Sequence, residues 1–157
     1  MIGIIVITYF VADIVRRSQI ETLTTEYESE IEEIISMTEN FTNNFLQGSV
    51  KMDSARETRE VGNYYFDFAL FWYSTALVNT TNSSIQQCTE NCTDAMVQYL
   101  ASYQKFGDSK PYFETAKTYT DKYLVILGYY VAFAQSGMNI TMLRYNASQY
   151  LKYAAEN

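Results

Sequence analysis

The chain contains neither proline nor glycine between Ile4 and Gln47, and this absence constrains the fold more than any other feature. Proline and glycine are the strongest breakers of regular structure, so nothing in this stretch marks an end. Its apolar residues recur at spacings of three, four or seven, mostly with glutamates between them: Ile20, Leu23, Tyr27, Ile31, Ile34, Phe41 and Phe45. This periodicity is typical of an amphipathic helix. We expect one helix of about 40 residues, about 60 Å long, ending at Gly48.

Six of the ten asparagines lie in the N-glycosylation pattern Asn-x-Ser/Thr, namely Asn40, Asn79, Asn82, Asn91, Asn139 and Asn146. Ser and Thr fill 28 of 157 positions, so roughly two matches are expected by chance. The excess predicts a surface that carries N-linked glycans outside the cytoplasm, at the cell surface or beyond it.

Residues 1–15 are almost wholly apolar, interrupted by Thr8 and Asp13 and followed by two arginines. At 1.5 Å a residue they span roughly 22 Å, short of the ~20 residues that cross a bilayer comfortably. They also lack the basic residues that precede the apolar run of a signal peptide. We expect an assembly or anchor segment, buried by neighbouring subunits or in contact with lipid, that uses Ile4, Ile5, Ile7, Phe10, Val11, Asp13, Ile14, Arg16 and Arg17.

The charges beside this segment conflict with the glycosylation pattern. Arg16 and Arg17 follow the apolar run, and the positive-inside rule would then place the rest of the chain in the cytoplasm. One resolution of the conflict is that Met1 is not the translation start and that a basic leader has been removed from in front of it.

The remaining sequence favours shorter helices at about 51–78, 93–107, 111–135 and 140–155, with a loop at 79–91. Gly107 and Gly137 are interpreted as helix ends, and Pro111 as part of a first turn. No run of period-two alternation predicts a strand. The expected fold is all-α: a long N-terminal helix over 1–47, its front half apolar, and a bundle domain over 48–157. The rear half of the first helix completes a four- to five-helix antiparallel bundle.

The run from Tyr64 to Tyr73 is aromatic on every side of a helix and is expected to be buried or to form an interface. The interface candidates are Tyr64, Tyr65, Phe68, Phe71 and Trp72. Asp67 within this run is either a satisfied polar group or an acid with a perturbed pKa, and the first interpretation is favoured.

Cys88 and Cys92 are the only cysteines. In an oxidising compartment an even number of cysteines favours a disulfide, here closing a small loop. The alternative is two free thiols one helical turn apart. A metal site is less favoured, because the chain has no histidine and no second cysteine pair.

No catalytic signature is present. The absence of histidine excludes Ser-His-Asp and Cys-His arrangements, and the six glycines are isolated rather than gathered in a phosphate loop. The 11 basic residues are scattered in a chain of net charge −7, so nucleic acid is not an expected partner. We expect a protein that is not an enzyme and needs no cofactor and no metal.

An apolar N-terminal helix that continues into a glycosylated outer part resembles archaeal type IV pilin-like proteins. The resemblance covers residues 1–47. It implies a filament subunit that assembles with copies of itself through residues 1–15 and presents its glycans outward. A membrane-anchored four-helix-bundle sensor and a single-pass accessory subunit of a membrane complex are the alternatives.

Overall fold

The computed structural model describes residues 2–78 and 82–157, with side chains from Val15 onward in the first segment. It is all-α, as predicted, and these residues form three helices: α1 over Ile2–Val78, α2 over Asn82–Lys117 and α3 over Leu124–Glu156. The chain divides into two units, residues 1–40 and residues 41–157.

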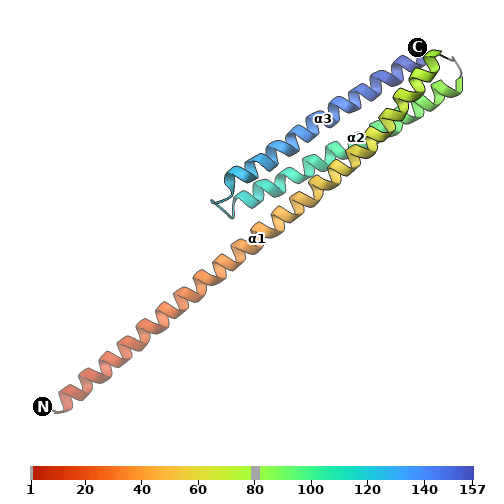
Figure 1. The fold of residues 1–157 in the computed structure, drawn as a ribbon. Helices are drawn as coiled ribbons and strands as arrows, with labels where there is room; N and C mark the ends of the chain where they lie inside the picture. Colours follow the sequence, from red (N-terminus) through yellow and green to blue (C-terminus); the bar gives the residue numbers. More distant parts are fainter. Residues whose placement is uncertain (1, 79–81) are drawn as a thin grey trace. The chain divides into compact units, whose positions relative to one another are not determined.

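Unit 41–157 is an antiparallel three-helix bundle (Figure 1). The part of α1 from Phe41 onward lies beside α2 and α3. The hydroxyl of Ser102 on α2 donates a 2.7 Å hydrogen bond to the carbonyl oxygen of Ala55 on α1. Lys110 of α2 reaches Gln135 of α3 at 2.6 Å. The expected four- to five-helix bundle is wrong in number, since the described residues hold three longer helices.

The bundle core follows a seven-residue repeat. On α2 the buried residues succeed one another at alternating spacings of three and four from Cys88 onward: Cys88, Cys92, Ala95, Tyr99, Ser102, Phe106, Ser109, Phe113 and Ala116. The same spacing in α1 gives positions that are all buried or half-buried: 41, 45, 48, 52, 55, 59, 62, 66, 69, 73 and 76. This 3.5-residue period is that of coiled coils, in which the two apolar positions of each repeat are named a and d.

Three aromatic side chains of α2, seven residues apart, each lie against a glycine of a neighbouring helix. A Cβ added to Gly48 would lie 2.9 Å from the ring of Phe113, and one added to Gly62 would lie 2.8 Å from the ring of Tyr99. Gly137 of α3 meets Phe106 in the same way. The glycines therefore make room for rings, whereas the sequence suggested that Gly48 and Gly137 end helices.

The other predicted breaks are also wrong. Gly107 and Pro111 lie inside α2 rather than in a turn. Pro111 has no N–H to donate to the carbonyl of Gly107, and this costs a hydrogen bond without ending the helix. The expected loop at 79–91 is helical from Asn82, and residues 79–81 lie outside the described part of the chain. The turn between α2 and α3 instead occupies residues 118–123.

Buried hydroxyls in the bundle are satisfied within it. Thr141 donates to the carbonyl of Gly137 at 2.7 Å, and Ser109 donates to that of Phe106 at 2.7 Å. Within the described residues, every buried side-chain nitrogen and oxygen has a hydrogen-bond partner. Since an unpaired buried polar group is costly, the small hydroxyl residues can occupy core positions without penalty.

Candidate functional site

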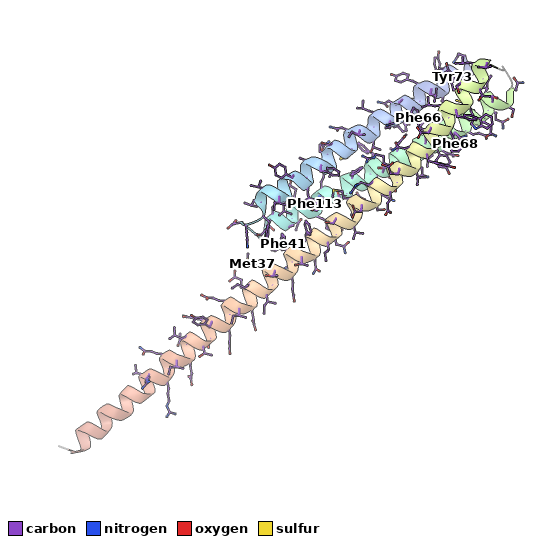
Figure 2. All side chains as sticks on the ribbon, in the orientation of Figure 1. Met37, Phe41, Phe66, Phe68, Tyr73 and Phe113 are labelled. Atoms are coloured by element: carbon purple, nitrogen blue, oxygen red, sulfur yellow. The ribbon has the colours of Figure 1, made fainter. Side chains whose placement is uncertain are left out.

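Unit 1–40 carries an exposed apolar stripe on one side of its helix. All described side chains from Val15 to Asn40 are exposed (Figure 2). From Ile20 onward seven of them are large and apolar, and we call them the N-terminal stripe: Ile20, Leu23, Tyr27, Ile31, Ile34, Ile35 and Met37. Tyr27 and Ile34 leave 66% and 63% of their surface in solvent. A contiguous exposed apolar surface of this kind is typical of an interaction site.

The stripe has the same repeat as the bundle core. Counting back from Phe41 and Phe45 at spacings of three and four gives positions 38, 34, 31, 27, 24 and 20. Four of these are apolar members of the stripe, and the other two are Thr24 and Thr38. Three consecutive repeats therefore present a coiled-coil seam that has no cover within the described residues.

The two threonines of this seam are compatible with burial. Thr24 donates its hydroxyl hydrogen bond to the carbonyl of Ile20 at 2.8 Å, and Thr38 donates to that of Ile34 at 2.8 Å. Thr141 in the bundle core is bonded in the same way. The hydroxyl needs no outside partner, so each threonine can present its methyl group to a neighbouring helix.

The surroundings of the seam are strongly acidic. Residues 18–50 contain no Lys or Arg and seven glutamates: Glu21, Glu26, Glu28, Glu30, Glu32, Glu33 and Glu39. Arg16 and Arg17 are exposed directly before this stretch. The other predicted assembly residues, Ile4 to Ile14, have side chains outside the described part of the chain.

A second apolar surface lies on the outer face of α1 within the bundle. Val61, Tyr64, Phe68 and Phe71 follow one another at spacings of three and four and are all exposed, and we call them the outer aromatic stripe. The rings of Tyr64 and Phe68 are 4.6 Å apart. Three of the five interface candidates thus belong to it, while the remaining two, Tyr65 and Trp72, are half-buried. Asp67 beside it is exposed.

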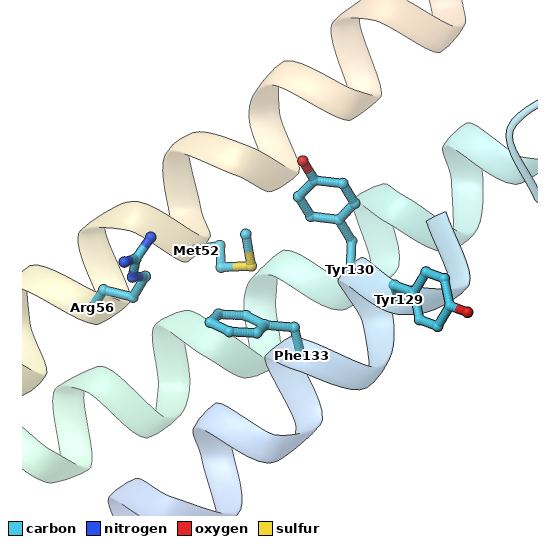
Figure 3. Close-up of a pocket in the computed structure, with 5 residues that line it drawn as sticks. All are labelled: Met52, Arg56, Tyr129, Tyr130 and Phe133. Carbon is cyan, nitrogen blue, oxygen red and sulfur yellow. The ribbon is translucent and has the colours of Figure 1, made fainter. Parts of the chain in front are cut away.

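A shallow groove of about 320 Å³ separates α1 from α3 (Figure 3). Its lining is mostly apolar: Met52, Arg56, Tyr129, Tyr130 and Phe133. The ring of Tyr130 also stacks at 5.0 Å on Phe113 of the core. Arg56 supplies the one charge of the lining, 3.5 Å from the Asp53 carboxylate. A mostly apolar lining of this kind is typical of a surface that receives an apolar group of a ligand.

Cys88 and Cys92 lie one turn apart on the buried face of α2, close to Ala69 of α1 and Leu151 of α3. The structure holds both as free thiols. Burial raises the pKa of the Cys92 thiol to about 12 and also raises the pKa of Cys88. A buried thiol with a raised pKa is a weak nucleophile, so the pair acts as core packing here. The predicted disulfide is not formed in this structure, and the helix replaces the predicted small loop.

Most of the predicted glycosylation sites are accessible. Asn40, Asn82, Asn139 and Asn146 are exposed, Asn91 is half-buried, and Asn79 lies outside the described residues. Asn139 and Asn146 are seven residues apart and therefore share one outer face of α3. The amide of Asn91 donates a 2.8 Å hydrogen bond to the carbonyl of Gln87.

No group of three or more Cys, Asp or Glu side chains within the described residues is placed to hold a metal ion. None of the helices, over the residues searched, has an apolar stretch long enough to cross a bilayer. Comparisons with protein-family models, with curated proteins and with solved structures found no match for this chain.

Several residues of these surfaces were missed by sequence reasoning. Ile35 and Met37 widen the N-terminal stripe, and their spacing could have shown it. The seven-residue spacing of Tyr99, Phe106 and Phe113 was the signal for the bundle core. The groove joins segments about 80 residues apart, and no local pattern brings such segments together.

Proposed function

We propose that this protein is an extracellular, N-glycosylated structural subunit of a pilus-like cell-surface filament, in which copies assemble through the N-terminal part of α1. The observation that supports this most is the N-terminal stripe. A helix that leaves seven large apolar side chains in solvent over residues 20–37 is stabilised when another helix covers them. Residues 2–15 belong to the same helix and have an apolar sequence that neighbouring subunits or lipid would bury.

The glycosylation pattern supports the outward orientation of the bundle. Four of the six asparagines in sequons have exposed side chains, where a glycan meets no packed neighbour. No role in catalysis and no cofactor form part of the proposal.

Electron microscopy of native cell surfaces, without detergent, tests this function. The proposal predicts ordered filaments in which one subunit repeats along a helical axis and an antibody to the bundle labels the whole length. Membrane-bound particles without filaments would contradict it.

A membrane-anchored binding ectodomain is the second candidate, favoured by the groove between α1 and α3. In that case the full chain would bind an apolar fluorescent probe such as anilinonaphthalene sulfonate in the groove. Phe133→Lys would then abolish most of the binding, and Phe71→Lys on the outer aromatic stripe would leave it unchanged. Equal loss in both variants would show general surface binding and remove this candidate.

A further inference from the structure

The N-terminal stripe has the geometry of one strand of a coiled coil. We propose that residues 20–41 of α1 pair with the same residues of a second copy of this chain, parallel and in register. This inference rests on the part of the proposed function in which copies of the chain associate. It adds the partner's identity, the direction of the pairing and the residues that set it.

The continuity of the repeat identifies the class of partner. The a and d positions that face α2 and α3 in the bundle run on without a shift into residues 20–38. In the bundle the α1 positions are covered by α2 and α3. The buried positions of those two helices mix apolar residues with hydroxyl residues, of which Ser109 and Thr141 bond to carbonyls of their own helices. A seam of this composition fits another helix with the same repeat.

The charges favour a parallel pair. In a parallel coiled coil, residue g of one helix lies beside residue e of the next repeat in its partner. Here Arg16 occupies position g and Glu21 occupies position e, so each copy offers an attractive pair to the other. The next two pairs of g and e positions, Leu23 with Glu28 and Glu30 with Ile35, each combine a glutamate with an apolar residue, and neither brings like charges together.

An antiparallel pair is disfavoured by the same charges. Overlapping the stripe with its own copy in the opposite direction centres the pair near Glu28. Glu28 and Glu30 then approach their own copies across the seam. Residues 18–50 contain no Lys or Arg to neutralise them, and like charges at such positions are destabilising.

Association of the full chain in a mild non-ionic detergent, measured by sedimentation, tests the seam. Ile31→Glu with Ile34→Glu places two charges at its centre. Ser29→Glu with Ser36→Glu adds the same charges to the opposite side of the helix and is the matched control. We expect the seam variant to weaken association about 100-fold or more, and the control to change it less than threefold. Both variants should keep the parent's helical circular dichroism, since all four positions are exposed.

Cross-linking tests the direction. Ile20→Cys lies at position d, where a parallel in-register pair brings it to its own copy, and copper phenanthroline should then join the two chains. In an antiparallel pair the two cysteines would be about 25 Å apart and would not react. Thr22→Cys, on the outer side of the helix, is the control for position. The parent chain shows how much cross-linking comes from the native Cys88 and Cys92.

The outcomes separate this inference from the proposed function. Equal association of the seam variant and its control would overturn the coiled coil, and so would a monomeric parent chain. Filaments that persist on cell surfaces with Ile31→Glu and Ile34→Glu would overturn it while leaving the filament proposal standing. A cross-linked parallel pair from cells without filaments would support the coiled coil and contradict the filament proposal.

Discussion

The ring of Phe106 on α2 lies directly over Gly137 on α3, where a Cβ atom would be 2.7 Å from its carbons. Phe106 has no exposed surface, and Gly137 is buried. The ring therefore occupies the space that a side chain at position 137 would need. Phe113 over Gly48 and Tyr99 over Gly62 repeat this relationship one heptad to either side on α2, and together they set the helix register of the bundle.

Gly137→Ala is expected to destabilise the bundle. Overpacking against a buried ring costs about 1–3 kcal/mol, and the better helix propensity of alanine returns at most about 1 kcal/mol. We expect a net loss of about 1–2 kcal/mol in the free energy of unfolding, measured by urea denaturation with circular dichroism.

Gly128→Ala on the same helix is the control for this substitution. No atom lies within 4 Å of the position where its Cβ would be built. It should therefore stabilise the chain by up to about 1 kcal/mol through helix propensity alone. A Gly137→Ala variant as stable as Gly128→Ala would show that the Phe106–Gly137 contact does not constrain the core.

The fold class could be predicted from the sequence, but the number of helices could not. Periodic apolar residues and the lack of strand patterns indicate helices without any tertiary information. Gly48, Gly107, Gly137 and Pro111 were interpreted locally as ends. Gly48 and Gly137 instead face rings of other helices, and Gly107 faces Met138. In a long helix the packing of many residues outweighs one unfavourable residue such as Pro111.

Stability at high pH depends on Tyr99. Burial raises the pKa of its hydroxyl to about 12, and the hydroxyl donates a 2.9 Å hydrogen bond to Asn63. The Tyr99 hydroxyl ionises near pH 10 in the unfolded chain, whereas in the folded chain it keeps its proton at that pH. The stabilisation that the protonated hydroxyl gives to the folded chain is thus complete below pH 10. As the pH rises toward 12, the free energy of unfolding falls by up to about 2–3 kcal/mol. Urea denaturation between pH 8 and 12 should show this loss in the parent.

Tyr99→Phe should flatten that decline, while lowering stability near pH 8 by about 1 kcal/mol because Asn63 loses its donor. Tyr64→Phe removes an exposed hydroxyl and should keep the parent's profile. Identical declines in the parent and in Tyr99→Phe would rule out the assignment of the pH effect to this hydroxyl.

The thiols of Cys88 and Cys92 are expected to be unreactive in the folded chain. Both are fully buried, and their raised pKa values keep them protonated at pH 8. A thiol reagent such as Ellman's should label them only in denaturant, with two thiols released per chain. Protein isolated from its source that releases none in denaturant until a reductant is added would instead carry the disulfide that the sequence predicts.

N-linked glycans are the test of the extracellular location. Enzymatic deglycosylation of native material should lower its mass in steps that correspond to occupied asparagines. Asn139→Gln and Asn146→Gln should each remove one step without changing stability by more than about 0.5 kcal/mol, since both side chains are exposed. A native chain of unmodified mass would contradict the location and with it the filament proposal.

Salt should strengthen association of the chain. Residues 15–40 carry seven glutamates and two arginines, so two paired copies repel each other overall. Screening shortens the range of this repulsion to about 8 Å at physiological ionic strength. Sedimentation equilibrium should therefore give a tighter complex in 500 mM than in 20 mM sodium chloride. A complex that weakens as salt is added would mean that attractive ion pairs hold it.

The candidate surfaces were only partly predictable. The stripe from Ile20 to Ile34 follows from spacing alone, because a helix places residues three and four apart on one side. Whether Tyr64, Phe68 and Phe71 face the core or the solvent depends on where α2 and α3 pack. In a run that is aromatic on every side, the sequence contains no signal for that choice.

The molar mass of the full glycosylated chain in mild detergent, measured by light scattering after size exclusion, tests the central claim most directly. The account predicts a particle with at least two copies of the chain, reduced to one copy by Ile31→Glu with Ile34→Glu and unchanged by Ser29→Glu with Ser36→Glu. A parent chain that remains a single copy at every concentration would contradict assembly through the N-terminal stripe.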